Sequence, residues 1–295
     1  MAVAAMETDE RTRALGEHLL LQTYLFEVLV PIFYEKPDGK FDAIGTGALL
    51  EIADRLFLVT AAHVLDGCEG ERLWSPWDRK AGTFGQWGTH SYLTPKNADR
   101  LDVAMVELEF PETITAFRKN YRLLNLAQIT APTPGRTHIL AGYPECMTDT
   151  SGQIIHQQPL AYHTELLDGE PKGWVDYHNP AQDLFFRLER QGELFSGKPH
   201  DVPKLNGASG CVIWEKSPYE GPLWTPQKEL KAVGILRSTK RDDGWFRATR
   251  WLPTVGLILQ FDRRAGAALA VSLLGEARAL ELIEEVWPEE GLPPS

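Results

Sequence analysis

A serine between small residues is the first feature of this sequence that could do chemistry. The segment Lys204-Leu-Asn-Gly-Ala-Ser-Gly-Cys-Val-Ile-Trp214 contains the pattern Gly-X-Ser-Gly around Ser209. Glycine neighbours let the backbone turn sharply, expose the hydroxyl, and aim amide groups at a developing oxyanion. We therefore predict that Ser209 is a nucleophile and that the N–H groups of Gly207 and Ser209 form an oxyanion hole. The alternative is an ordinary turn, because glycine and serine are common in turns.

Two further segments supply the partners that a serine nucleophile needs. The run Leu56-Phe-Leu-Val-Thr-Ala-Ala-His-Val-Leu65 places His63 at the end of an apolar strand, and the run Leu101-Asp-Val-Ala-Met-Val-Glu-Leu108 places Asp102 at the head of another. A histidine can take the serine proton and return it to the leaving group, while an aspartate fixes the imidazole tautomer. Taken singly, each has another interpretation: His63 as a packed core or loop histidine, and Asp102 as a turn carboxylate.

Five short motifs in this order resemble the trypsin-like serine peptidases of the chymotrypsin fold, particularly their divergent bacterial and intracellular members. The resemblance covers roughly residues 26–262. The motifs are Thr60-Ala-Ala-His63, Asp102-Val-Ala104, Ala141-Gly-Tyr-Pro144, Gly207-Ala-Ser-Gly210 and Val233-Gly-Ile235. The resemblance implies that His63, Asp102 and Ser209 form a catalytic triad.

The same resemblance implies an all-β fold of two six-stranded antiparallel barrels, with a helix before and after them. The amphipathic pattern near each end of the chain favours these helices. We expect a helical extension over 1–25, a first barrel over 26–115, an inter-barrel crossing over 116–134, a second barrel over 135–262, and a C-terminal helix and tail over 263–295. The segment 168–182 is predicted to be an inserted loop of unassigned role.

The predicted activity is that of a serine endopeptidase acting through an acyl-enzyme on a specific protein or peptide substrate, in a regulatory or defence pathway. One alternative is a catalytically silent peptide-binding or scaffold module of the same fold. Another is an esterase or acyl transferase, although the α/β-hydrolases that use such a serine place the acid and histidine after it.

Two departures from the family bear on regulation and cleavage preference. Ala208 stands where zymogens of the family keep an aspartate, so activation by a new amino terminus is not expected, and a regulatory protein partner, expression or loop ordering is the favoured control. Cys211 replaces a second glycine and is predicted to be a small buried residue.

The resemblance assigns the substrate cleft to Leu236, Arg237 and Ser238, with Lys204 before the nucleophile. Lys204 and Arg237 would favour an acidic substrate side chain, unless both face solvent.

Composition narrows the other classes of function. The chain has 295 residues and a net charge of −11, which argues against binding a nucleic-acid backbone as the main activity. No apolar run is long enough to span a membrane, and the first 25 residues do not have the pattern of a secretory signal. Three cysteines are too few for a disulfide framework, so we expect a cytoplasmic protein. No histidine spacing fits a metal site, and no cofactor is expected.

Overall fold

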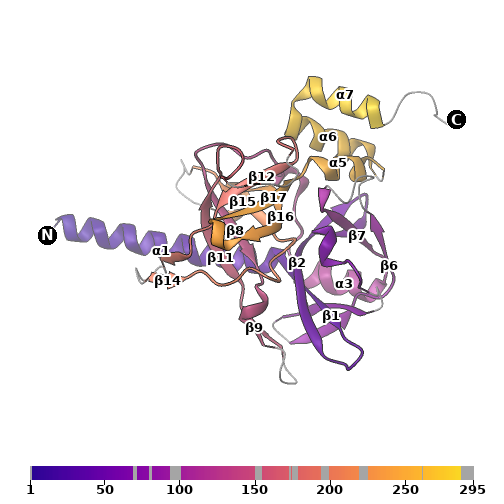
Figure 1. Cartoon of the computed structure of the whole chain (residues 1–295), viewed down its shortest axis with the longest axis horizontal. Helices are drawn as coiled ribbons and strands as arrows, with labels where there is room; N and C mark the ends of the chain where they lie inside the picture. Colours follow the sequence, from indigo (N-terminus) through magenta and orange to yellow (C-terminus); the bar gives the residue numbers. More distant parts are fainter. Residues whose placement is uncertain are drawn as a thin grey trace, which may run out of the picture.

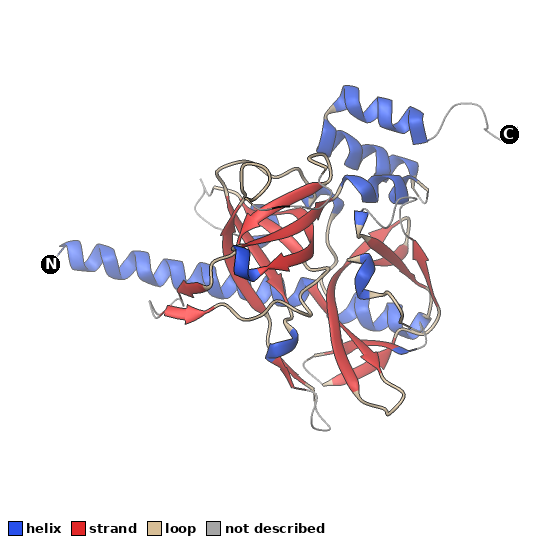
Figure 2. Cartoon of the chain, in the orientation of Figure 1, coloured by secondary structure: helices blue, strands red, loops and turns tan. Residues whose placement is uncertain are grey.

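Two antiparallel β-sheets lie side by side in the computed structural model, each strongly curled (Figure 1; Figure 2). The structure describes residues 2–68, 72–79, 82–93, 101–149, 155–172, 174, 179–193, 199–218, 225–260 and 262–286. The predicted tail after 286 lies outside these residues, as does part of the predicted insertion. In the described part of the chain, none of the helices combines the length and the apolar composition needed to cross a membrane.

The first sheet has seven strands in the order β5-β4-β1-β2-β3-β7-β6, where we had predicted six. Short strands at its edges, which loop-rich sequence concealed, account for the difference. Its strands are β1 (Leu29–Glu35), β2 (Phe41–Ile52), β3 (Arg55–Thr60), β4 (Leu73–Asp78), β5 (Thr83–Gln86), β6 (His90–Leu93) and β7 (Ala104–Leu108).

The second sheet has the predicted six strands, in the order β11-β8-β15-β16-β17-β12. Its strands are β8 (Thr137–Gly142), β11 (Leu160–Glu165), β12 (Asp183–Arg187), β15 (Val212–Lys216), β16 (Leu230–Lys240) and β17 (Trp245–Arg250). Two small ribbons accompany it: β9 (Thr148–Asp149) with β10 (His156–Gln157), and β13 (Gln191–Glu193) with β14 (Pro199–Asp201).

The β2–β3 hairpin delivers the segment that carries His63. Its turn residues Ala53 and Asp54 have φ values of 50° and 63°, which match the twist of a tight two-residue hairpin. Most residues of both strands are buried, and Leu49, Phe57 and Leu58 are fully so. In the sequence, the apolar runs 44–50 and 56–61, joined by the polar link 53–55, predict this hairpin, and the antiparallel pairing of β2 with β3 confirms it. The end of the hairpin fixes where the segment that carries His63 begins.

The segment after β7 crosses from one sheet to the other. It begins with helix α3 (Pro111–Asn120), and the short helical turn η3 (Leu126–Gln128) follows. The Leu124 amide donates to the Leu49 carbonyl on β2, and the Thr130 amide donates to the Ala232 carbonyl on β16. These two contacts attach opposite ends of the crossing to the two sheets.

The N-terminal helix is longer than predicted: α1 runs from Ala2 to Val28, and the first strand starts at Leu29. Leu21, Tyr24, Leu25 and Val28 are all buried, so the helical period continues through a stretch whose residue types favour strand. Its earlier part projects away from the sheets (Figure 1). The helical spacing of Leu15, Leu19 and Leu20 predicts that they pack inward, but this prediction is wrong: they are 42%, 54% and 51% exposed.

The predicted single C-terminal helix is three helices, which lie together above the two sheets in Figure 1. Asp262 caps α6 by accepting from the amides of residues 264 and 265, and Gly275 ends it with a φ of 77°. Apolar periodicity continues across these breaks, which explains why the sequence predicts one helix. The three are α5 (Leu252–Leu259), α6 (Arg263–Leu274) and α7 (Glu276–Val286).

Short helical turns complete the fold. They are η1 (Ala62–Val64), η4 (Glu145–Met147), η5 (Arg241–Asp243) and the short helix α4 (Pro226–Glu229). Three of them follow a strand, and α4 leads directly into β16.

Candidate active site

His63 lies in η1, directly after strand β3. Its neighbours Ala61 and Val64 are buried, whereas 45% of the His63 side chain is exposed. The short turn thus anchors the backbone on the first sheet and leaves one side of the imidazole accessible. This is the arrangement that a proton-transferring base needs.

Asp102 is held against His63 by three contacts. Its carboxylate oxygens lie 2.9 and 3.0 Å from His63 Nδ1, and Oδ1 also accepts from the His63 backbone amide at 2.9 Å. The backbone at Asp102 has a φ of 41°, a left-handed conformation that aspartate tolerates better than most residues. The carboxylate therefore fixes both the ring and the backbone of the histidine.

The pKa values of this pair move apart. The hydrogen bond that His63 Nδ1 donates to the Asp102 carboxylate raises the pKa of His63 above its ordinary value, against the opposing effects of burial and Arg237. Burial by itself would raise the pKa of Asp102, but the hydrogen bonds and charge of His63, with Arg237, lower it. Asp102 stays ionised and stabilises an imidazolium at His63.

A pH dependence follows from the raised pKa of His63. Only the neutral imidazole can accept the proton of a serine. The rate at which an active-site probe labels Ser209 should therefore be low in acid and rise with pH. The midpoint of that rise should lie above the ordinary histidine pKa of about 6.5. Initial rates of active-site labelling between pH 5 and pH 9 measure it. A flat profile, or a midpoint below the ordinary value, would contradict this assignment.

The turn around Ser209 depends on two glycines. Gly207 and Gly210 have φ values of 83° and 84°, and a Cβ at Gly210 would lie 2.0 Å from Thr60 Oγ1 and 2.7 Å from the Ala61 amide nitrogen. The turn is thus pressed onto the end of β3, directly before His63. A side chain at either glycine would displace Ser209 from this position.

Thr46 on β2 ties the same turn to the first sheet. Its amide donates to the Ser209 carbonyl at 2.9 Å, and its hydroxyl donates to the Gly207 carbonyl at 3.1 Å. The same hydroxyl accepts from the Tyr143 amide at 3.0 Å. The sequence shows Thr46 only as a threonine between two glycines, so it gives no signal of the partners of this hydroxyl.

The turn's amides divide into two groups. Those of Ala208 and Gly210 donate to the carbonyls of Leu205 and Leu236. Those of Gly207 and Ser209 have no acceptor among the residues that the structure describes. These two are the donors that the sequence assigns to an oxyanion hole.

The Ser209 hydroxyl is not hydrogen-bonded to His63 in this structure. Within the described chain, no hydrogen bond connects Ser209 Oγ with the His63 ring. Contacts of this kind are commonly long in a ligand-free enzyme and shorten when substrate binds. Gly45 lies between the helical turn that carries His63 and the turn that carries Ser209. A Cβ at Gly45 would lie 2.3 Å from the Val64 side chain and 3.2 Å from the Ser209 carbonyl oxygen.

Replacing Thr46 with valine tests the link between β2 and the serine turn. Valine keeps the shape but leaves the Gly207 carbonyl and the Tyr143 amide without their partner, so the free energy of unfolding should fall by about 1–3 kcal/mol. Chemical denaturation measures this, and the rate of labelling at Ser209 should fall with it. Thr115→Val makes the same chemical change on the exposed face of α3, where a loss of equal size would contradict the interpretation.

The predicted cleft residues fall in different places. Leu236 is fully buried, and its backbone pairs with both Gly210 and Cys211. Ser238 follows on β16 and is half-buried. The Arg237 guanidinium lies against Asp102, with Nε 3.5 Å from Oδ2. Cys211 is buried as predicted, and burial raises the pKa of its thiol, so it is poorly suited to act as a second nucleophile.

Lys204 is exposed at a pocket beside the serine turn. This pocket has a volume of about 400 Å³ and is also bordered by Asp42, Glu145, Cys146 and Asn206. Asn206 immediately precedes Gly207, and its carbonyl accepts from the Glu145 amide at 2.6 Å. The pocket therefore adjoins the candidate oxyanion hole and presents charges of both signs.

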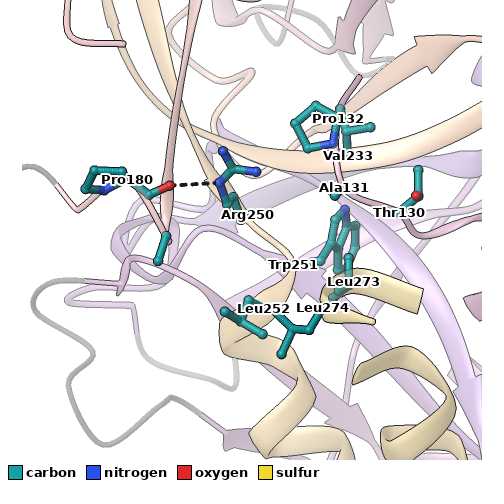
Figure 3. Close-up of a pocket in the computed structure, with 11 residues that line it drawn as sticks. Thr130, Ala131, Pro132, Pro180, Val233, Arg250, Trp251, Leu252, Leu273 and Leu274 are labelled. Carbon is teal, nitrogen blue, oxygen red and sulfur yellow. Dashed lines mark hydrogen bonds between the residues drawn. The ribbon is translucent and has the colours of Figure 1, made fainter. Parts of the chain in front are cut away.

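A second pocket lies away from the serine, between the second sheet and the C-terminal helices (Figure 3). It has a volume of about 180 Å³ and is lined by Val233, Trp251, Leu273 and other apolar residues. Arg250 borders it and donates to the Pro180 carbonyl at 3.1 Å. It presents no candidate nucleophile. Among the described residues, no group of His, Cys, Asp or Glu side chains could hold a metal ion.

Comparisons with known proteins give similarity of structure and none of sequence. No family model and no curated protein matches the chain. Similar solved structures include the MamO protease domain of Magnetospirillum magneticum, with 11% identity, a TM-score of 0.47, and coverage of 81% of this chain and 98% of that one. Human heparin binding protein is similar with 16% identity, a TM-score of 0.44, and coverage of 78% and 87%.

The chain itself has two curled antiparallel sheets, of seven and six strands. At such identities and TM-scores, the similarities say nothing about catalysis.

Proposed function

We propose that this protein is a serine endopeptidase. The observation that carries the proposal is the pairing of His63 with a buried Asp102 beside a glycine turn that carries Ser209. A histidine oriented through both its ring and its backbone is prepared to accept a proton from a serine. The amides of Gly207 and Ser209, which have no acceptor in the part of the chain that the structure describes, would stabilise the resulting oxyanion.

In the proposed reaction, Ser209 Oγ attacks the carbonyl carbon of the scissile peptide as His63 Nε2 takes its proton. The tetrahedral oxyanion accepts hydrogen bonds from the amides of Gly207 and Ser209. His63 then gives the proton to the leaving amine, and the C–N bond breaks to leave an acyl-enzyme. A water molecule, deprotonated by His63, hydrolyses the ester and restores Ser209.

We further propose a specific protein or peptide as substrate and an intracellular site of action. Strand β16 would pair with an extended peptide, because its residues Leu236 to Ser238 border the serine turn. The three free cysteines, of which Cys146 is exposed, favour a reducing compartment.

The preference for an acidic substrate side chain now depends on Lys204. The other candidate cation, Arg237, faces carboxylates of the protein itself. Cleavage-site profiling with a mixed peptide library tests this preference, and cleavage beside basic residues would reject it.

Labelling with a fluorophosphonate probe, followed by peptide mapping, tests the proposed function. Folded protein should acquire one adduct at Ser209, heat-denatured protein should acquire none, and His63→Ala should label far more slowly. Absence of an adduct, under conditions that fully label a known serine hydrolase, would contradict the proposal and favour a silent binding module. Cleavage of activated esters without cleavage of any peptide in the library would instead favour an esterase.

A further inference from the structure

Arg237 occupies an irregular position in strand β16. The pairing of β16 with β17 shifts register between Leu236 and Ser238, so Arg237 is an extra residue in a β-bulge. A bulge redirects a side chain relative to the regular alternation of a strand. Leu236, immediately before it, is hydrogen-bonded to the backbone of Gly210 and Cys211, which places the bulge next to the serine turn.

The redirected side chain lies between two carboxylates. Arg237 Nε is 3.5 Å from Asp102 Oδ2, and Nη1 is 3.8 Å from Asp183 Oδ1. Only 17% of the Arg237 side chain is exposed, and the two carboxylate side chains are 10% and 3% exposed. Charges this well shielded from water interact more strongly than exposed pairs do.

Asp183 is fixed in turn by a buried arginine. Arg247 Nε and Nη2 donate to its two oxygens at 2.8 and 2.7 Å, and the Asn179 amide donates to Oδ2 at 2.8 Å. Arg247 on β17 and Asp183 on β12 are both almost completely buried. The result is a row of alternating charges that extends from the second sheet to Asp102.

We propose that Arg237 is a positioning residue that holds Asp102 in place for His63 by linking it to the buried Asp183–Arg247 pair. This role rests on the proposed function, because it matters for catalysis only if His63 acts as a base. The link gives the Asp102 carboxylate, whose backbone has an unusual conformation, a second charged partner besides His63.

The charges that face each group decide the expected direction. His63 faces Asp102, Asp66 and Arg237, while Asp102 faces His63 and Arg237. Asp183 faces Arg237, Arg247 and Arg250. Arg237 repels an imidazolium, so it lowers the pKa of His63 against the larger effect of Asp102. It thereby extends the range in which His63 is a neutral base toward lower pH.

The test compares Arg237→Gln with Arg237→Lys and with Lys240→Gln, which removes one exposed positive charge from the same strand. The first readout is the His63 imidazole titration followed by NMR, with the resonance assigned from His63→Ala. The second is the pH dependence of fluorophosphonate labelling. In Arg237→Gln, we expect the pKa of His63 to rise, and labelling at neutral pH to slow by about 3- to 10-fold. Arg237→Lys should restore most of the wild-type His63 pKa and labelling rate, and Lys240→Gln should leave the His63 pKa and the labelling rate unchanged.

An unchanged His63 titration in folded Arg237→Gln, or an equal change in Lys240→Gln, would overturn the proposal. If the glutamine variant fails to fold, Arg237→Met provides a neutral side chain of similar length for the same measurement. The NMR titration needs no catalysis. Failure of the wild type to label would therefore count against the proposed function alone, while the titration would still decide the role of Arg237.

Discussion

Replacement of Ser209 with alanine is expected to abolish fluorophosphonate labelling and to lower the rate of peptide cleavage by about 10⁵- to 10⁶-fold. The physical reason is that no other nucleophile is available at this turn. Ala208 has no nucleophilic group. Cys211 is buried, and burial raises the pKa of its thiol. Alanine fits the half-buried position of Ser209 without strain, so the free energy of unfolding should change little.

The measurement is a comparison of purified wild type and Ser209→Ala on the same peptide mixture, with cleavage followed by mass spectrometry. Ser217→Ala, at the end of β15, is a matched control that removes a hydroxyl outside the site and should keep full activity. Residual cleavage within tenfold of wild type would show that a different group attacks the substrate, and it would remove Ser209 from the proposed mechanism.

Replacement of Asp102 with asparagine is expected to lower the same rate by about 10³- to 10⁴-fold. Asparagine has nearly the same shape, and it tolerates the left-handed conformation at this position. It offers an amide in place of one carboxylate oxygen, so it favours the wrong imidazole tautomer and no longer stabilises an imidazolium. The pKa of His63 should fall relative to wild type, because the hydrogen bond from His63 to Asp102 is the largest cause of its rise.

Rate measurements across pH, together with NMR titration of His63, test this second prediction. The control is Asp242→Asn, which neutralises an exposed carboxylate paired with Arg190. A variant that keeps more than a tenth of wild-type activity, or a His63 pKa that does not fall, would show that Asp102 has only a structural role.

The two predictions separate the functions that share this fold. A silent binding module would keep its peptide affinity in both variants and show no labelling in the wild type. A peptidase would lose turnover in both variants, and Ser209→Ala would still bind substrate. Binding measured alongside turnover therefore distinguishes loss of chemistry from loss of the site.

Local sequence determined the parts of this protein that depend on neighbouring residues. The two apolar runs 44–50 and 56–61, joined by the polar link 53–55, predicted the hairpin β2–β3. The glycines around Ser209 predicted a sharp turn, because positive φ values exclude most other residues. Helix boundaries were less accurate: tertiary packing of Tyr24 against Trp214 extends α1 into residues whose types favour a strand.

Only the tertiary structure decided which distant residues meet. The hydroxyl of Thr46 bridges residues 143 and 207, and nothing in its local sequence encodes those partners. The family resemblance placed Arg237 in the cleft, but a bulge turns it toward Asp102 and Asp183. Short-range periodicity reflects the backbone geometry of single elements, whereas these contacts depend on how two sheets curl and pack. The sequence could therefore name the candidate nucleophile and base, and the fold was needed to reveal what holds them.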